Sequence, residues 1–269
     1  SDNNIFFGYN DAVKQANIDT YQKKQLDSSV KVSSNKTGYG YLHELFVKRH
    51  RKLLTRSARN FSIGIFVILV SVVIMIYFSP GAAVKANRML LNSLPLALMF
   101  MYFINRGQYV TQAMFMNCDH SMLTYRFFRQ PEAVLQLFRQ RLRTLVAINL
   151  LPASLIALGL PLVLYLSGGT DNPLNYLVLF LSILSMSVFF SVHHLVMYYL
   201  LQPYNVELQT KSVTYGIVNY ITYLIPFAFM YIKLPTIVFG SCMVGFAILY
   251  VFLSLIFAYK HAPKTFKLR

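Results

Sequence analysis

The sequence predicts an all-α, polytopic membrane protein with six transmembrane helices. Of its 269 residues, 56% are hydrophobic and 13% are charged, whereas soluble domains carry about 25% charged residues. Several apolar stretches approach the ~20 residues that a helix needs to cross a bilayer. These stretches are continuously apolar rather than alternating, which excludes a transmembrane β-barrel. The six predicted spans are residues 61–78, 89–104, 145–166, 174–201, 212–231 and 236–259.

An amphipathic segment precedes the first predicted span. Within residues 41–59, Leu42, Phe46 and Leu53 fall on one helical face, and basic residues lie mostly around the other faces. We therefore expect an interfacial helix in the lipid headgroup region. A solvated basic helix that only marks the inner side of the membrane is the alternative.

The polar segments complete the predicted organisation. The chain begins without Met and its first 40 residues are polar, so we expect it to be truncated or to be one half of a longer polypeptide. The predicted parts are a polar cytoplasmic tail or linker (1–40), the interfacial helix (41–59), the six-helix domain (60–260) with a cytoplasmic insertion (117–143), and a basic cytoplasmic tail (261–269).

The distribution of positive charge predicts the orientation. The formal net charge is +16, and because the basic residues flank apolar spans, they indicate topology and contact with anionic lipid rather than nucleic-acid binding. Of the 25 Lys and Arg residues, all but Lys85, Arg88 and Lys233 lie in segments on one side. By the positive-inside rule that side is cytoplasmic. We expect a multi-pass protein of the cell membrane with both termini in the cytoplasm.

A basic, aromatic segment, residues 117–132, lies between two predicted spans. Charges such as those of Asp119 and Arg126 are too costly to leave in lipid, so the segment lies outside the bilayer. Two interpretations are open. The segment inserts aromatic and arginine side chains into a groove on a cytoplasmic partner, or it packs as a membrane-surface loop on its own bundle.

The end of this segment predicts the start of a helix at Gln130, Pro131 and Glu132. Proline fits the first turn of a helix, and a glutamate there stabilises the positive end of the helix dipole. Arg139, Arg141 and Arg143 are expected near the membrane. The apolar residues of this helix share one face: Val134, Leu135, Phe138, Leu142 and Leu145.

Six spans with cytoplasmic ends, an amphipathic helix before the first span and a helical insertion between the second and third resemble a known layout. Residues 41–260 are similar to the transmembrane domain of an ABC-2-type ABC transporter permease, and 117–129 resembles cytoplasmic segments of permeases from Gram-positive bacteria. The resemblance implies that 41–59 is the connecting helix. It implies that the insertion is a coupling helix that docks on a nucleotide-binding subunit, through His120, Tyr125, Arg126, Phe127, Phe128, Arg129 and Glu132.

The same resemblance implies the partners and cofactors. The chain has no Gly-rich phosphate-binding loop ending in Gly-Lys-Ser or Gly-Lys-Thr, so ATP and Mg would bind to the partner subunit and no cofactor to this chain. A second permease copy or half and membrane lipid are the other expected partners. The spans contain no constellation typical of a catalytic site, so we do not expect an enzyme.

Polar residues within the spans are candidates for a translocation pathway. Adjacent histidines point about 100° apart on a helix, so His193 and His194 cannot face one ligand. We favour a reading in which one bonds a neighbouring helix and the other lies near a polar cavity. The candidates for the pathway are Asn92, His193, His194, Asn219 and Tyr220.

The resemblance therefore implies a permease subunit or half of an ABC transporter. It would export a hydrophobic or amphipathic substrate, such as a peptide or a lipid-like molecule, by ATP-driven alternating access. The alternative is a non-transporting membrane scaffold or sensor that recruits a cytoplasmic partner. An intramembrane enzyme that uses His193 or His194 ranks last.

Overall fold

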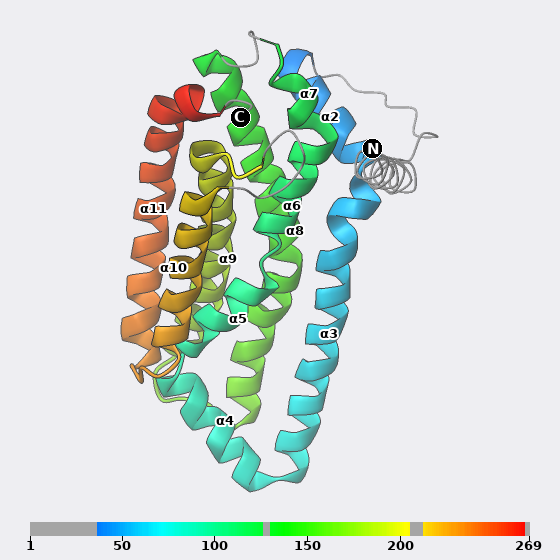
Figure 1. The fold of residues 1–269 in the computed structure, drawn as a ribbon. Helices are drawn as coiled ribbons and strands as arrows, with labels where there is room; N and C mark the ends of the chain where they lie inside the picture. The colour runs from blue at the N-terminus through cyan, green and yellow to red at the C-terminus, as the bar shows by residue number, and fades with distance from the viewer. Residues whose placement is uncertain (1–36, 126–129, 205–211, 267–269) are drawn as a thin grey trace, which may run out of the picture.

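Long helices run side by side through the whole length of the molecule (Figure 1). The computed structural model describes residues 37–125, 130–204 and 212–266. One end of the bundle carries α2 and α7 and is called the α2 end below; the opposite end carries α4 and is called the α4 end. The elements in order are α2 (Gly38–Arg49), α3 (Arg51–Phe78), α4 (Pro80–Asn92), α5 (Leu96–Ile104), α6 (Gly107–Met114), the π-helix η1 (Phe115–Asp119), α7 (His120–Met122), α8 (Pro131–Leu166), α9 (Leu174–Leu201), α10 (Val213–Phe229) and α11 (Thr236–Thr265).

Four helices in the described part of the chain are long and apolar enough to cross a membrane: α3, α8, α9 and α11. The fifth predicted span corresponds to α10, a shorter apolar helix of 17 residues. The all-helical class and the presence of membrane-spanning helices therefore agree with the prediction. The total of six spans stays a prediction.

The second predicted span differs from the expectation of one helix over residues 89–104. The structure interrupts it at Ser93–Pro95, so that α4 ends at Asn92 and α5 begins at Leu96. Proline has no N–H to continue the helical ladder. The carbonyl of Asn92, the last residue of α4, accepts from the backbone N–H of Leu234 at 3.0 Å, so it is satisfied without a helical partner.

The predicted interfacial helix is divided between two elements. α2 ends at Arg49, His50 makes a bend, and residues 51–59 form the first turns of α3. α2 lies against α8, since the ring of His43 bonds the hydroxyl of Thr144 at 2.8 Å and Phe46 is buried.

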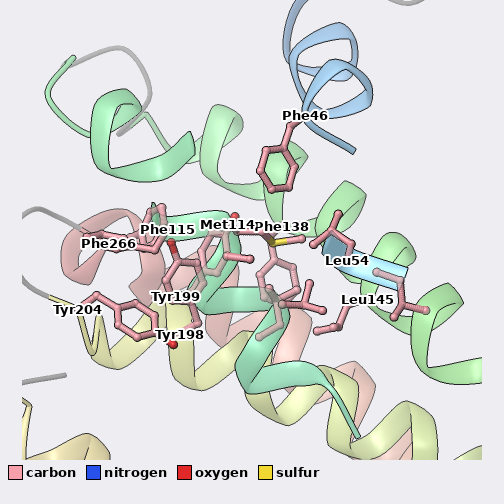
Figure 2. Packing of buried hydrophobic residues seen from close by; sticks show 14 of the residues in the cluster. Phe46, Leu54, Met114, Phe115, Phe138, Leu145, Tyr198, Tyr199, Tyr204 and Phe266 are labelled. Atoms are coloured by element: carbon pink, nitrogen blue, oxygen red, sulfur yellow. The ribbon is translucent and has the colours of Figure 1, made fainter. Parts of the chain in front are cut away.

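Two clusters of buried residues form the core. At the α2 end, Phe115, Phe138, Tyr198 and Tyr199 pack with residues of α3, α6 and α11 (Figure 2). A second cluster, around Leu98, surrounds the other half of α9. Because α9 contacts α8 and α11 extensively and also touches α5, α6 and α10, it is the central helix of the bundle. This explains why α9 is apolar on all sides.

Helix α3 lies at the edge of the bundle and leaves most of its apolar surface uncovered. Phe66, Val67 and Ile68 are all exposed, and the main neighbour of α3 is α8. Such a continuous apolar face fits a lipid-facing helix. On its packed side, Leu69 lies against Gly159, where a Cβ atom would stand 2.5 Å from a Leu69 methyl.

Candidate functional site

Helices α5 and α6 are separated by a non-helical break at Asn105 and Arg106. The break leaves backbone groups without helical partners, and polar side chains take their place. The Arg106 N–H donates to Asn149 Oδ1 at 2.8 Å, and the Gly107 N–H donates to Asn105 Oδ1 at 2.8 Å. Irregular backbone within a bundle of spans is stable only where it is satisfied in this way.

The side chains that hold the break belong to α8 and α9. Asn149 is 2% exposed and donates from Nδ2 to Ser191 Oγ at 2.9 Å. Ser187 donates to the Asn149 carbonyl at 3.4 Å, and Asn105 Nδ2 contacts Ser191 Oγ at 3.3 Å. Ser187 and Ser191 of α9 therefore help to fix the position of the break.

A cavity of about 350 Å³, called the break cavity below, opens beside this segment. The lining comes mainly from the end of α5, the break and α6, with one contribution from α9. It includes Tyr102, Asn105, Arg106, Gln108, Gln112 and His194. The cavity is therefore rich in polar side chains although it adjoins apolar spans.

Arg106 supplies the positive charge of the break cavity. Its Nε donates to the carbonyl of Ile104 at 3.0 Å, and one terminal nitrogen donates to the carbonyl of Phe103. The guanidinium also lies over the ring of Phe61, 3.9 Å from the centroid. Phe61 opens the apolar part of α3, so Arg106 lies where that apolar run begins at the α2 end.

The two adjacent histidines on α9 have different surroundings. His193 Nδ1 lies 2.7 Å from the Tyr250 hydroxyl, and its Nε2 lies 2.9 Å from the hydroxyl of Thr222. His193 therefore links α9 to α10 and α11. His194 is 5% exposed and lines the break cavity, and its Nδ1 is buried without a hydrogen-bond partner among the described residues.

A second cavity, of about 500 Å³ and almost wholly apolar, lies between α5, α9, α10 and α11. His193 and Phe190 line it from α9, and Leu98 lines it from α5. One turn along α5, Tyr102 lines the break cavity and packs against Phe190 with ring centroids 5.8 Å apart. A polar cavity and an apolar cavity therefore adjoin at the Tyr102–Phe190 contact.

The other predicted pathway residues are not brought to this place. Asn92 ends α4 and lines a separate cavity of about 770 Å³ at the α4 end. Asn219 lies on α10, where its Oδ1 is buried without a partner among the described residues. Tyr220 is 60% exposed. Of the five predicted residues, only His194 lines the break cavity.

The predicted partner-coupling residues are only partly described. Arg126, Phe127, Phe128 and Arg129 lie outside the described residues. His120 begins α7 and its ring packs edge-on against Phe115. Tyr125 and Glu132 are both exposed. The predicted helix start is confirmed, because α8 begins at Pro131 with Glu132 in its first turn.

The structure adds an ionic cluster that sequence reasoning missed. Asp119 and Arg141 are 1% and 2% exposed. Both terminal nitrogens of Arg141 donate to the Asp119 carboxylate, one of them to Oδ2 at 2.6 Å. The Tyr198 hydroxyl donates to the same carboxylate oxygen, and Arg141 donates to the Tyr199 hydroxyl at 2.8 Å. The cluster ties the end of η1 to α8 and α9.

The protonation of this cluster follows from its surroundings. Burial raises the pKa of the Asp119 carboxyl above its ordinary value, while Arg141 and the Tyr198 hydroxyl oppose that rise. Burial lowers the pKa of Arg141, but Asp119 and the two tyrosines more than offset it, so that pKa lies well above its ordinary value. Arg141 is therefore a fixed positive charge, and Asp119 is its partner.

The sequence did contain a signal for the position of Arg141. Val134, Phe138 and Leu145 are buried on one face of α8, and Arg141 falls on that face at spacings of three and four residues from Phe138 and Leu145. A charged residue in such a register needs a buried partner. Nothing in the spacing identifies Asp119 as that partner.

Comparison with protein-family models, with curated proteins and with solved structures gave no match. The described residues also contain no group of three or more His, Cys, Asp or Glu side chains placed to hold a metal ion.

Proposed function

We propose that this chain is the membrane-spanning permease part of a transporter for a hydrophobic or amphipathic substrate. The observation that carries the proposal is the break between α5 and α6, whose backbone is held by Asn149 and Asn105 and which lines a polar cavity. Discontinuous helices that line a cavity are the usual way in which transporters build substrate sites. A membrane protein that only anchors a partner has no need of such a break.

The proposal includes six spans with both termini in the cytoplasm, so the α2 end faces the cytoplasm. It is supported by the basic residues near that end, since Arg139 and Arg143 are exposed on α8 there. At the α4 end the basic residues of the sequence are Lys85 and Arg88 in α4 and Lys233 before α11.

ATP hydrolysis would take place on a separate nucleotide-binding subunit. That subunit would dock on residues 120–132, a segment that follows η1 and leads into α8. The Asp119–Arg141 pair ties the start of this segment to the long helix α8. A push on the segment would therefore move α8 and α9 rather than only a loop, which is what alternating access requires. A second copy or half would complete the transporter, as in the resembled family.

Co-purification with an ATPase subunit tests this assignment. The triple replacement of Tyr125, Phe127 and Phe128 by Ala removes aromatic side chains from the docking segment without touching the spans. If they are anchors, each change should cost on the order of 1–3 kcal/mol of association. The matched control replaces Tyr77, Tyr165 and Tyr259, three exposed tyrosines outside the docking segment, by Ala.

The docking variant should lose the ATPase subunit and transport while it still inserts and purifies, and the control should keep both. Full retention of the ATPase subunit by the docking variant would contradict the proposed docking segment. Capture of a cytoplasmic protein without nucleotide-binding activity would favour the scaffold or sensor.

A further inference from the structure

The charge of Arg106 has no counter-ion within residues 37–125, 130–204 and 212–266. Two of its nitrogens donate to backbone carbonyls, and its other contact is the ring of Phe61. Among the residues that the structure describes, none that lines the break cavity is acidic. A cation beside apolar spans without an anion is energetically unfavourable, so a negatively charged group from outside the described chain would stabilise it.

His194 offers a second polar group to the same cavity. It is 5% exposed, its Nδ1 is buried without a partner in the described segments, and it lines the cavity from α9. Buried polar atoms in native structures are nearly always satisfied. Gly107 permits this approach, because a Cβ there would lie 2.6 Å from His194 Cβ. The arrangement keeps an imidazole, an arginine and the amides of Gln108 and Gln112 around one space.

The depth of the cavity indicates where a ligand would come from. The Arg106 guanidinium lies over the ring of Phe61, the first residue of the apolar part of α3. The Arg106 backbone N–H bonds Asn149, which lies four residues after Leu145, the first residue of the third predicted span. Both contacts place Arg106 near the edge of the apolar part of the bundle. Basic side chains at such a boundary meet the head groups of lipids. The apolar cavity, which adjoins the break cavity at the Tyr102–Phe190 contact, would accept a hydrocarbon chain.

From these observations we infer that the break cavity is a binding site for an amphipathic anion. Arg106 would hold the acidic group of this molecule, and His194, Gln108 and Gln112 would form hydrogen bonds to it. The apolar chain of the molecule would be directed toward the apolar cavity. This inference rests on the proposed function and specifies the substrate class. Carboxylate and phosphate share the required chemistry, because both accept hydrogen bonds from a guanidinium.

Direct binding to the purified full chain in neutral detergent tests the inference without any ATPase subunit. The probes are palmitate, palmitoyl lysophosphatidate, uncharged monopalmitoylglycerol and inorganic phosphate, measured by native mass spectrometry. The two charged lipids should bind, and whichever binds more tightly identifies the acidic group. The uncharged lipid and inorganic phosphate should bind at least tenfold more weakly, because each lacks one half of the recognised structure.

Arg106→Gln should weaken binding of the charged lipids about ten- to hundredfold, the expected loss of a charge-assisted contact. Arg143→Gln is the matched control, since Arg143 is an exposed arginine of α8 outside the cavity. Gln108→Trp keeps Arg106 and narrows the cavity, so it should also weaken binding. It provides a second test if Arg106→Gln fails to fold.

Equal binding of the uncharged lipid, equal binding of phosphate alone, or equal weakening by Arg143→Gln would each overturn the inference. Any of these results would leave the permease assignment standing if the ATPase subunit still co-purifies. If no ATPase subunit co-purifies with the unmodified chain while the charged lipids still bind, the permease assignment is refuted and the binding site is not.

Discussion

Arg141 on α8 donates from both terminal nitrogens to the carboxylate of Asp119, although 22 positions separate the two residues in the chain. The carboxylate also accepts from Tyr198, and Arg141 also donates to Tyr199. Each charge is thus surrounded by partners with little solvent exposure. The pair and its tyrosine partners join the π-helix η1 to α8 and α9, so its loss should destabilise the packing of all three elements.

Arg141→Leu should destabilise the protein by about 3–5 kcal/mol, because it leaves the Asp119 carboxylate buried without a counter-ion. Replacing Asp119 and Arg141 together by apolar residues should cost less than the sum of the two single changes. Thermal unfolding in detergent measures both. Arg143→Leu, an exposed position two residues away, should stay within about 0.5 kcal/mol. Equal effects of the two arginine changes would show that Arg141 is not a buried partner.

Gly107→Ala should push α6 away from α9, since the new Cβ would lie 2.6 Å from His194 Cβ and 2.8 Å from Asn105 Oδ1. A Cβ atom is part of the rigid frame of a residue and cannot rotate aside. We expect a loss of about 1–3 kcal/mol in stability. Gly245→Ala in α11, where a Cβ meets open space, should be neutral or gain about 0.5–1 kcal/mol. If Gly107→Ala left the free energy of unfolding unchanged, α6 and α9 would have to be farther apart at Gly107 and His194 than in the structure.

His193→Leu should weaken the packing of α10 and α11 on α9, because the ring bonds Tyr250 and Thr222 at 2.7 and 2.9 Å. Double-mutant cycles with Tyr250→Phe and Thr222→Val should each give a coupling of about 0.6 kcal/mol, the average for polar contacts between membrane helices. The readout is unfolding in detergent. His194→Leu in the same cycles should show no coupling to either partner.

The thiol of Cys118 should react slowly with maleimide. Burial raises its pKa to about 12, with Asp119 adding to the rise. At pH 7–8 the reactive thiolate is therefore about a thousandfold scarcer than for an ordinary cysteine, and its fraction should rise about tenfold per pH unit up to that value. Mass spectrometry in a Cys242→Ala background gives the rate.

The control for this measurement is Ser121→Cys combined with Cys118→Ser, which puts a thiol at an exposed position three residues away. That thiol should be labelled rapidly, and its rate should level off near pH 9 because an ordinary thiol is largely deprotonated there. Equal rates and equal pH profiles at the two positions would contradict the partly buried environment of Cys118.

The orientation of the bundle can be measured with single cysteines at Gln130 and Asp171, both exposed and at opposite ends. A membrane-impermeant maleimide added outside intact cells should label the Asp171→Cys variant and leave the Gln130→Cys variant unlabelled. Opening the cells should make Gln130→Cys reactive, which serves as its own control. External labelling of Gln130→Cys would exclude a cytoplasmic docking segment.

The helical class, the start of α8 at Pro131 and the turn at 167–173 could be predicted because each depends on local sequence. Continuous apolar runs specify spans, proline marks a first turn, and Gly168 and Gly169 supply the positive φ angles of the turn between α8 and α9. These features need no knowledge of what lies opposite in space.

The break between α5 and α6 could not be predicted, because it depends on Asn149, 43 positions away, which bonds the Arg106 N–H. The local sequence around Asn105 and Arg106 indicates only that a span ends there, because it does not show that Asn149 is a partner. The same limit applies to Tyr198 and Tyr199. Both lie near the end of the predicted span 174–201, and nothing in their spacing indicates that they are buried and bond the Asp119–Arg141 pair.

The π-helix η1 sets the angular phase of the chain that follows it. Its wider turn is closed by the His120 N–H donating to the carbonyl of Phe115, five residues earlier, and it holds one residue more than an α turn. That extra residue rotates the helical turn that follows directly, α7, by about 100°. Deleting one residue between Phe115 and Cys118 would thus turn His120–Met122 about the helix axis rather than merely shorten the segment. Which side chains of α7 face away from the bundle therefore depends on one additional residue in η1.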